Sequence, residues 1–218
     1  MSKQEIIQFN EKKIFSKDDY IFDETNKSAF EIINSFPNWQ NNLVNLVGPK
    51  KSGKSLLLKI LEITHSFLYI SEKSFQKDNL DTIFKSERLI LDIDVLLEDK
   101  VFSIVNDFYT NKKYLVISSN KPLTNIQFKL KDLSSRFKLF NIIEILNPSD
   151  QLIYSLIIKF FSDNQIVIKK ELVNFIVKKI DRSYLRVNNF LEKLNNQSIV
   201  EKRKIDFKMI NKVIDTMV

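Results

Sequence analysis

The sequence contains no cysteine and a single histidine, His65. The absence of cysteine excludes disulfide bridges, iron–sulfur clusters, cysteine-ligated zinc and thiol nucleophiles. One histidine excludes a multi-histidine metal site and leaves little room for a Ser/His/Asp triad. The longest nearly apolar stretch, residues 152–161, contains Lys159 and is far shorter than the ~20 residues that span a bilayer. Because the polar N-terminus also lacks an apolar signal core, we expect a cytoplasmic protein without membrane association.

Glycine and proline are scarce as well, with two and four residues among 218. The content of 44% hydrophobic and 28% charged residues is typical of a globular chain that buries a core without covalent or metal cross-links. The net charge is +7 at pH 7. Solvated helix faces explain this charge in the simplest way, and weak contact with nucleic acid is the alternative.

The hydrophobic pattern predicts an α/β protein. Short apolar runs typical of buried strands lie at residues 43–47, 67–70, 88–93, 114–118 and 140–145, with a brief strand-like segment at 20–22. Helical spacing is found at residues 24–36, 54–65 and 99–109, and in three or four segments after Pro148. This order predicts an N-terminal arm (1–18), a parallel sheet flanked by helices (19–146) and a small all-helical lid (147–218).

One motif carries most of the functional prediction. Residues 48–55 read GPKKSGKS and fit the phosphate-loop pattern G-x-x-x-x-G-K-[ST], between a predicted strand and a predicted helix. Both glycines of the chain occupy the two positions where the pattern requires them. Successive backbone N–H groups and the helix N-terminus would bind phosphate, while Lys54 would reach the β- and γ-phosphates and Ser55 would ligate Mg²⁺. The predicted binding residues for ADP or ATP are Gly48, Pro49, Lys50, Lys51, Ser52, Gly53, Lys54, Ser55 and Asp92.

Asp92 ends the apolar run that begins at Arg88, where it would hold Mg²⁺ through water together with Ser55. Hydrolysing proteins of this type usually carry a second acid directly afterwards, and here that position is Ile93. Asp94 would face the same way as Asp92 if the strand continued, whereas a turn at Asp94 is the simpler interpretation. We therefore expect weak intrinsic hydrolysis.

Three further polar residues have a functional and a structural interpretation each. Asn120 follows the 114–118 run and could sense the γ-phosphate, or it could be a turn residue before Pro122. Arg136 could act as an arginine finger on a neighbouring subunit's nucleotide, or it could be a surface charge. Arg186 could fold from the lid onto bound phosphates, or it could stay solvated. Spacing alone leaves these alternatives open.

Taken together, these motifs resemble the AAA+ module of the DnaA family of replication initiators, and within it the short Hda homologues that inactivate DnaA. In the family's terms GPKKSGKS is Walker A, LILD ending at Asp92 is Walker B, and VISSNKP contains Asn120 as sensor 1. DLSSRF resembles box VII with Arg136 as the finger, and YLRVNNFLEKL resembles the sensor 2 helix with Arg186. Since the sequence ends at Val218, directly after the lid, we expect no sequence-specific DNA binding.

The N-terminal segment QEIIQF resembles the hexapeptide with which bacterial proteins dock on the sliding clamp. Gln4 would supply the hydrogen bond and Ile7 and Phe9 the apolar anchors, whereas Glu5 and Ile6 depart from the pattern. The resemblance implies a protein that sits on the DNA-loaded clamp and presents Arg136 in trans to ATP bound by DnaA.

Other interpretations of the same motifs stay open. A homodimer that hides the finger is compatible with them. A helicase-loader-type AAA+ ATPase that binds single-stranded DNA is an alternative function, and a P-loop kinase or nucleotidase is another.

Overall fold

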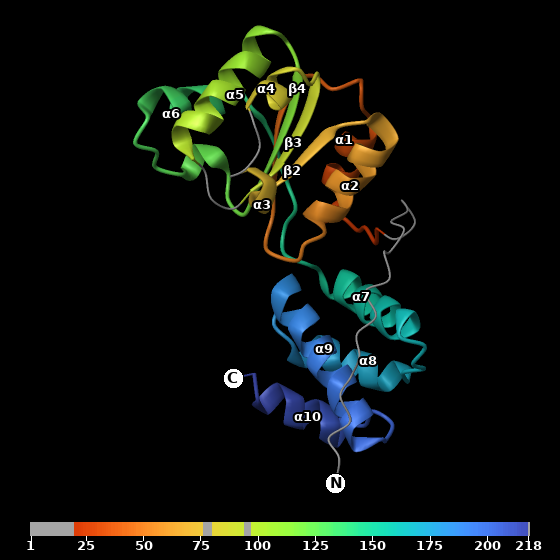
Figure 1. Cartoon of the computed structure of the whole chain (residues 1–218). Coiled ribbons are helices and arrows are strands. Elements are labelled where there is room, and N and C mark those ends of the chain that lie inside the picture. Colours follow the sequence, from red (N-terminus) through yellow and green to blue (C-terminus); the bar gives the residue numbers. More distant parts are fainter. Residues whose placement is uncertain (1–19, 76–79, 94–96, 218) are drawn as a thin grey trace.

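In a computed structural model the chain forms an α/β body followed by an all-helical lobe (Figure 1). The structure describes residues 20–75, 80–93 and 97–217. The body contains β1 (Leu43–Val47), β2 (Leu68–Ser71), β3 (Arg88–Asp92), β4 (Tyr114–Ser119) and β5 (Asn141–Glu144). These strands form one parallel sheet in the order β2-β3-β4-β1-β5. The predicted α/β class with a parallel sheet is confirmed.

Helices cover both faces of the sheet, which makes the body a three-layer structure (Figure 1). One face packs against α1 (Lys27–Asn34) and α2 (Lys54–His65). The other packs against α4 (Leu80–Phe84), α5 (Glu98–Thr110) and α6 (Lys131–Phe137). The short helices α3 (Glu72–Phe75) and η2 (Leu123–Asn125) follow β2 and β4. Because each face is covered, the interior strand β1 is buried at every position, which explains why its sequence LVNLV is apolar except for Asn45.

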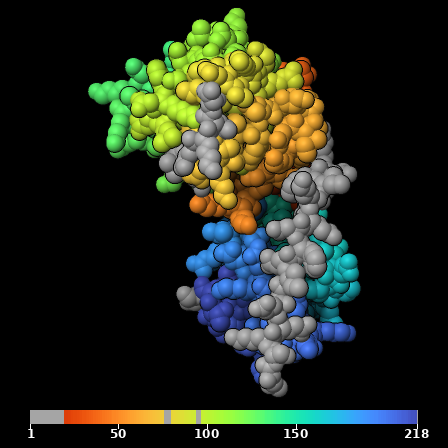
Figure 2. Space-filling model, viewed as in Figure 1, coloured from red at the N-terminus to blue at the C-terminus, as the bar shows by residue number. Residues whose placement is uncertain are grey.

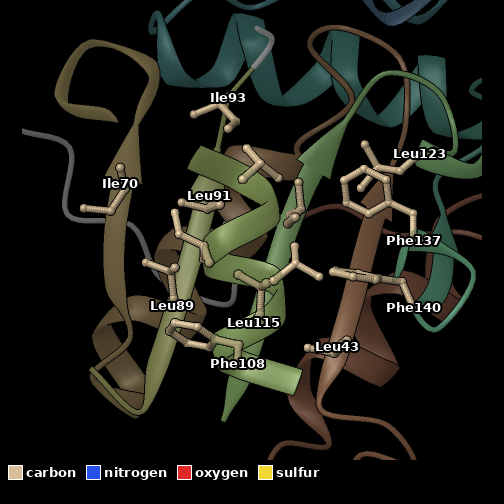
Figure 3. Packing of buried hydrophobic residues seen from close by; sticks show 14 of the residues in the cluster. Leu43, Ile70, Leu89, Leu91, Ile93, Phe108, Leu115, Leu123, Phe137 and Phe140 are labelled. Carbon is tan, nitrogen blue, oxygen red and sulfur yellow. The ribbon is translucent and has the colours of Figure 1, made fainter. Parts of the chain in front are cut away.

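Side chains alternate between the two cores along each strand. On β3, Leu89 and Leu91 pack on the α5 side, and Ile90 packs on the α2 side. Figure 3 shows Leu89 and Leu115 beside Phe108 of α5 in the first of these cores. Phe108 is fully buried, and burying a side chain of this size stabilises the fold by roughly 1.5–3 kcal/mol.

The helical lobe has a core of its own. It consists of α7 (Asp150–Asp163), α8 (Lys170–Lys179), α9 (Tyr184–Glu201) and α10 (Phe207–Asp215). Three of these helices begin at a side-chain cap: Ser149, Ser183 and Asp206 each accept a hydrogen bond from the backbone N–H three residues later. Ile153, Ile157, Phe161, Phe190 and Met209 are among the fully or almost fully buried residues of its core. Figure 2 shows the two lobes meeting at a narrow waist.

The structure corrects one prediction and leaves others outside its range. The strand expected at residues 20–22 is absent: the Asn26 side chain bonds the Ile21 carbonyl and the Asp23 N–H, and so shapes a turn before α1. The predicted arm (1–18) and Asp94 lie outside the described residues. The division of the chain at residues 146 and 147 stays a prediction.

Candidate functional site

The phosphate loop, residues 48–53, connects β1, an interior strand of the sheet, to α2. Gly53 has a φ of 91°, in the left-handed region, and a Cβ there would lie 3.0 Å from Cε2 of Tyr20. A Cβ at Gly48 would lie 2.9 Å from Oγ of Ser52 and 3.0 Å from Cβ of Ile145. The loop is therefore wrapped so tightly that both positions favour glycine.

Lys54 and Asn120 meet at this loop. The Lys54 ammonium donates hydrogen bonds to the carbonyls of Gly48 (2.6 Å) and Pro49 (3.0 Å), and it lies 3.3 Å from Oδ1 of Asn120. α2 begins at Lys54, and its N-cap Gly53 has no side chain to cap the first turn, which leaves the positive end of the helix dipole directed at the loop. The structure thus brings the two residues predicted to contact the γ-phosphate within hydrogen-bond distance of each other.

Ser55 and Asp92 form the second part of the site. The Ser55 hydroxyl donates a hydrogen bond to Oδ2 of Asp92 at 3.0 Å, and the Tyr69 hydroxyl donates one to the same oxygen at 2.5 Å. Burial raises the pKa of Tyr69, and the hydrogen bond to Asp92 raises it further, so Tyr69 stays protonated and can donate.

The donor set at Ser55 and Asp92 fits Mg²⁺, because both side chains offer hard oxygen atoms and Mg²⁺ usually combines one or two protein ligands with phosphate oxygens and water. Within the described part of the chain, no group of three or more histidine, aspartate or glutamate side chains could hold a metal ion by itself. A metal held by Ser55 and Asp92 would therefore take its other oxygen ligands from bound phosphate and water.

A buried amide on β1 positions the loop that carries Asn120. Asn45 donates to the Ile117 carbonyl (3.0 Å) and to the Ser119 hydroxyl (2.9 Å), and its Oδ1 accepts from the Leu123 N–H at 3.0 Å. Asn45 is 1% exposed, so these bonds satisfy a polar group that would otherwise be costly to bury. They tie the end of β4 to the strand that precedes the phosphate loop.

Arg136 lies apart from this cluster, on α6. Its guanidinium donates to Oδ1 of Asn106 at 2.9 Å, and its Cζ lies 4.9 Å from the centre of the Tyr109 ring. Both partners belong to α5, on the face of the sheet opposite α1 and α2 (Figure 1).

Arg186 contacts its own lobe. It donates to the Met217 carbonyl at 2.8 Å, and its Nε lies 3.6 Å from Oδ2 of Asp181. Two residues earlier, Tyr184 belongs to the same buried apolar cluster as Tyr20 of the body, and burial raises the pKa of Tyr184 to about 12. The first turn of α9 thus meets the body through Tyr184, and the proposed movement of Arg186 onto phosphates stays a prediction.

The sequence motifs did not identify Asn45 and Tyr69. Asn45 had a usable signal, because it is the single polar residue in the buried strand LVNLV. Tyr69 had none, because its partner Asp92 lies 23 residues away and only strand pairing brings the two together.

A parallel sheet in this order, with a phosphate loop after the interior strand β1 and a helical lobe after the last strand β5, defines an AAA+ fold. Comparison with solved structures agrees: domain III of DnaA from Thermotoga maritima matches with a TM-score of 0.74 at 17% identity, over 93% of this chain and 96% of that one. AMPPCP-bound DnaA from Aquifex aeolicus matches with a TM-score of 0.67 at 17% identity, over 86% and 65% of the two chains.

Sequence comparison points to the same group. The DnaA protein of Onion yellows phytoplasma is 22% identical over 94% of this chain and 47% of its own length, so the chain spans about half of that relative. No protein-family model matches the chain. The chain thus has the AAA+ fold and is similar in sequence and structure to the AAA+ part of DnaA proteins. In the described part of the chain, no helix is long and apolar enough to cross a membrane.

Proposed function

We propose that this chain is an AAA+ regulator of replication initiation that binds ADP or ATP together with Mg²⁺. The observation that supports the site is the grouping of Lys54 with Asn120 and of Ser55 with Asp92 around one phosphate loop. The similarity to AMPPCP-bound DnaA from Aquifex aeolicus supports an adenine nucleotide.

In this site each group has a defined task. The loop N–H groups and the start of α2 bind phosphate oxygens, and Lys54 exchanges the carbonyls of Gly48 and Pro49 for the β- and γ-phosphates. Ser55 and Asp92 would hold Mg²⁺, which supplies positive charge beside the phosphates. Asn120 directs its amide toward the same region from β4.

The chain's own ATP hydrolysis is proposed to be slow. The residue after Asp92, Ile93, is 4% exposed and packs in the apolar core between the sheet and α5. An apolar side chain there cannot polarise water for attack on the γ-phosphate. Such a site holds a nucleotide rather than turning it over.

The finer proposal is that Arg136 acts in trans on ATP bound by DnaA, in the manner of Hda. Arg136 lies on α6 with its guanidinium on the α5 side chains Asn106 and Tyr109, and not with Lys54 and Ser55 of its own site. An arginine that reaches a neighbouring subunit's nucleotide stabilises charge on the transferring phosphoryl group and accelerates hydrolysis by roughly 10³–10⁵. The proposal includes docking on the sliding clamp through Gln4, Ile7 and Phe9, which lie outside the described residues.

The test measures ADP formation from labelled ATP pre-bound to DnaA of the same organism, with the clamp loaded on DNA. We expect the wild-type chain to accelerate ADP formation and Arg136→Ala to lose this effect while still binding nucleotide. Arg182→Ala is the matched control, because it removes an exposed arginine that pairs with Asp150 in the helical lobe. Equal acceleration by wild type and Arg136→Ala would refute the finger.

A second candidate is binding of single-stranded DNA, as in a helicase loader. It is favoured by the net charge of +7 and by the description of one structural relative as DnaA bound to AMPPCP and single-stranded DNA. If the chain binds nucleotide but leaves DnaA hydrolysis unchanged, binding of a labelled oligonucleotide should be measured at several salt concentrations. True phosphate contacts would weaken steeply as salt rises.

A further inference from the structure

Tyr69 reaches the magnesium side of the site from a strand that does not carry the phosphate loop or Asp92. It lies on β2, where it pairs in register with Ile90 of β3, while Ser71 pairs with Asp92. Because side chains alternate along parallel strands, Tyr69 and Asp92 occupy the same face of the sheet. The Tyr69 hydroxyl donates to Oδ2 of Asp92 at 2.5 Å.

The ring of Tyr69 is fixed on its other sides. It packs against the core between the sheet and α2, and the Lys59 ammonium lies 4.1 Å from its centroid. Lys59 is itself held by Glu62 of the same helix, with 2.6 Å between Nζ and Oε2. The hydroxyl is thus presented to Asp92 by a ring that has little freedom to turn away.

We propose that Tyr69 is a positioning residue that fixes the Asp92 carboxylate for magnesium-dependent nucleotide binding. The inference rests on the proposed nucleotide site. Oδ2 of Asp92 accepts both the Tyr69 and the Ser55 hydroxyl, so the two donors hold the carboxylate in one rotation. Hydrogen bonds of this kind behind a metal-holding carboxylate are typically worth 10–100-fold in metal affinity.

Tyr69→Phe tests this directly, because it keeps the ring and its contact with Lys59 and removes only the donor. Binding of a fluorescent ADP analogue is followed at increasing Mg²⁺ concentration and again with EDTA. We expect the variant to need about tenfold more Mg²⁺ for half of the metal-dependent gain in affinity. Its affinity for ADP in EDTA should equal that of the wild type.

Two further variants make the result specific. Tyr114→Phe removes a hydroxyl from β4, where the ring packs edge-on against Phe36 and Trp39, and it should not change the Mg²⁺ requirement. Asp92→Asn should itself raise the Mg²⁺ requirement, and adding Tyr69→Phe to it should have no further effect, since the pair acts through one carboxylate.

The outcomes separate the inference from the function on which it rests. A wild-type chain that does not bind ADP overturns the proposed nucleotide site and this role with it. A wild-type chain that binds ADP equally well with Mg²⁺ and with EDTA overturns the role of Tyr69 and leaves the nucleotide site standing. A wild type that shows the dependence and a Tyr69→Phe that matches it overturn the role of Tyr69 alone. Equal loss of ADP affinity with and without Mg²⁺ in Tyr69→Phe also overturns it, because such a loss indicates a general structural defect.

Discussion

Replacing Gly53 with alanine should destabilise the body by about 2 kcal/mol, even in the absence of any ligand. The φ of 91° at Gly53 lies in the left-handed region, where a residue with a Cβ pays roughly 1–2 kcal/mol. The added Cβ would also lie 3.0 Å from Cε2 of Tyr20, inside the ~3.5–4.0 Å of a normal carbon contact. Tyr20 is 6% exposed and stacks on Phe30 at 5.4 Å, so its ring has little room to withdraw.

Urea unfolding followed by the fluorescence of Trp39, the single tryptophan, measures this effect in the body. Gly53→Ala should lower the midpoint without changing the slope. Ser66→Gly is the matched control with the opposite sign: Ser66 has a φ of 54° at the C-cap of α2, and glycine there should stabilise by roughly 0.5–1 kcal/mol. A Gly53→Ala protein within about 0.5 kcal/mol of wild type would refute the argument from backbone strain and contact.

Two further predictions concern the contribution of Asn45 and of Asp23 to the stability of the fold. Asn45→Leu should cost about 1–3 kcal/mol in unfolding free energy, because it leaves the Leu123 N–H buried without its partner; an unchanged urea midpoint would contradict this. Burial acts to raise the pKa of Asp23, but hydrogen bonds from Ser149 and Thr25 outweigh it and hold the pKa below its usual value of 3.8. The stability from this carboxylate is therefore complete above pH 3.8 and lost as the pH falls through the lower native value. Asp23→Asn should lower the melting temperature at neutral pH, and in strong acid the variant and the wild type should melt at the same temperature. A difference in melting temperature that is constant at every pH would contradict this role of the Asp23 carboxylate.

The core of the site could be predicted because its residues follow a rule of chain order. In parallel sheets the carboxyl ends of all strands meet at one edge, so a phosphate loop after β1, Asp92 at the end of β3 and Asn120 after β4 converge wherever the sheet forms. The sequence motifs identified these residues by type and spacing. The pairing of β4 with β1 and with β3 then brings them to the same edge of the sheet.

The supporting contacts could not be predicted, because each depends on a side chain that meets a partner far along the chain. In the sequence, Tyr69 cannot be told apart from the other residues of an apolar strand. Only the pairing of β2 with β3 places its hydroxyl beside the Asp92 carboxylate. The segment 20–22 has strand-like residues, yet the local hydrogen bonds of Asn26 produce a turn instead. Local side-chain bonds of this kind compete with strand formation.

The partners of Arg136 bear on whether it can serve as a finger. Asn106 and Tyr109 are uncharged, so among the residues that the structure describes the guanidinium is held by an amide oxygen and an aromatic face rather than by a carboxylate. Releasing an arginine from a partly exposed aromatic ring costs roughly 0.5–1 kcal/mol, whereas separating it from a buried carboxylate would cost several times more. A phosphate group of a neighbouring nucleotide offers a bidentate, fully charged partner in return. The contacts with Asn106 and Tyr109 therefore hold Arg136 in place without pairing its positive charge with a negative one, which favours the proposed action in trans.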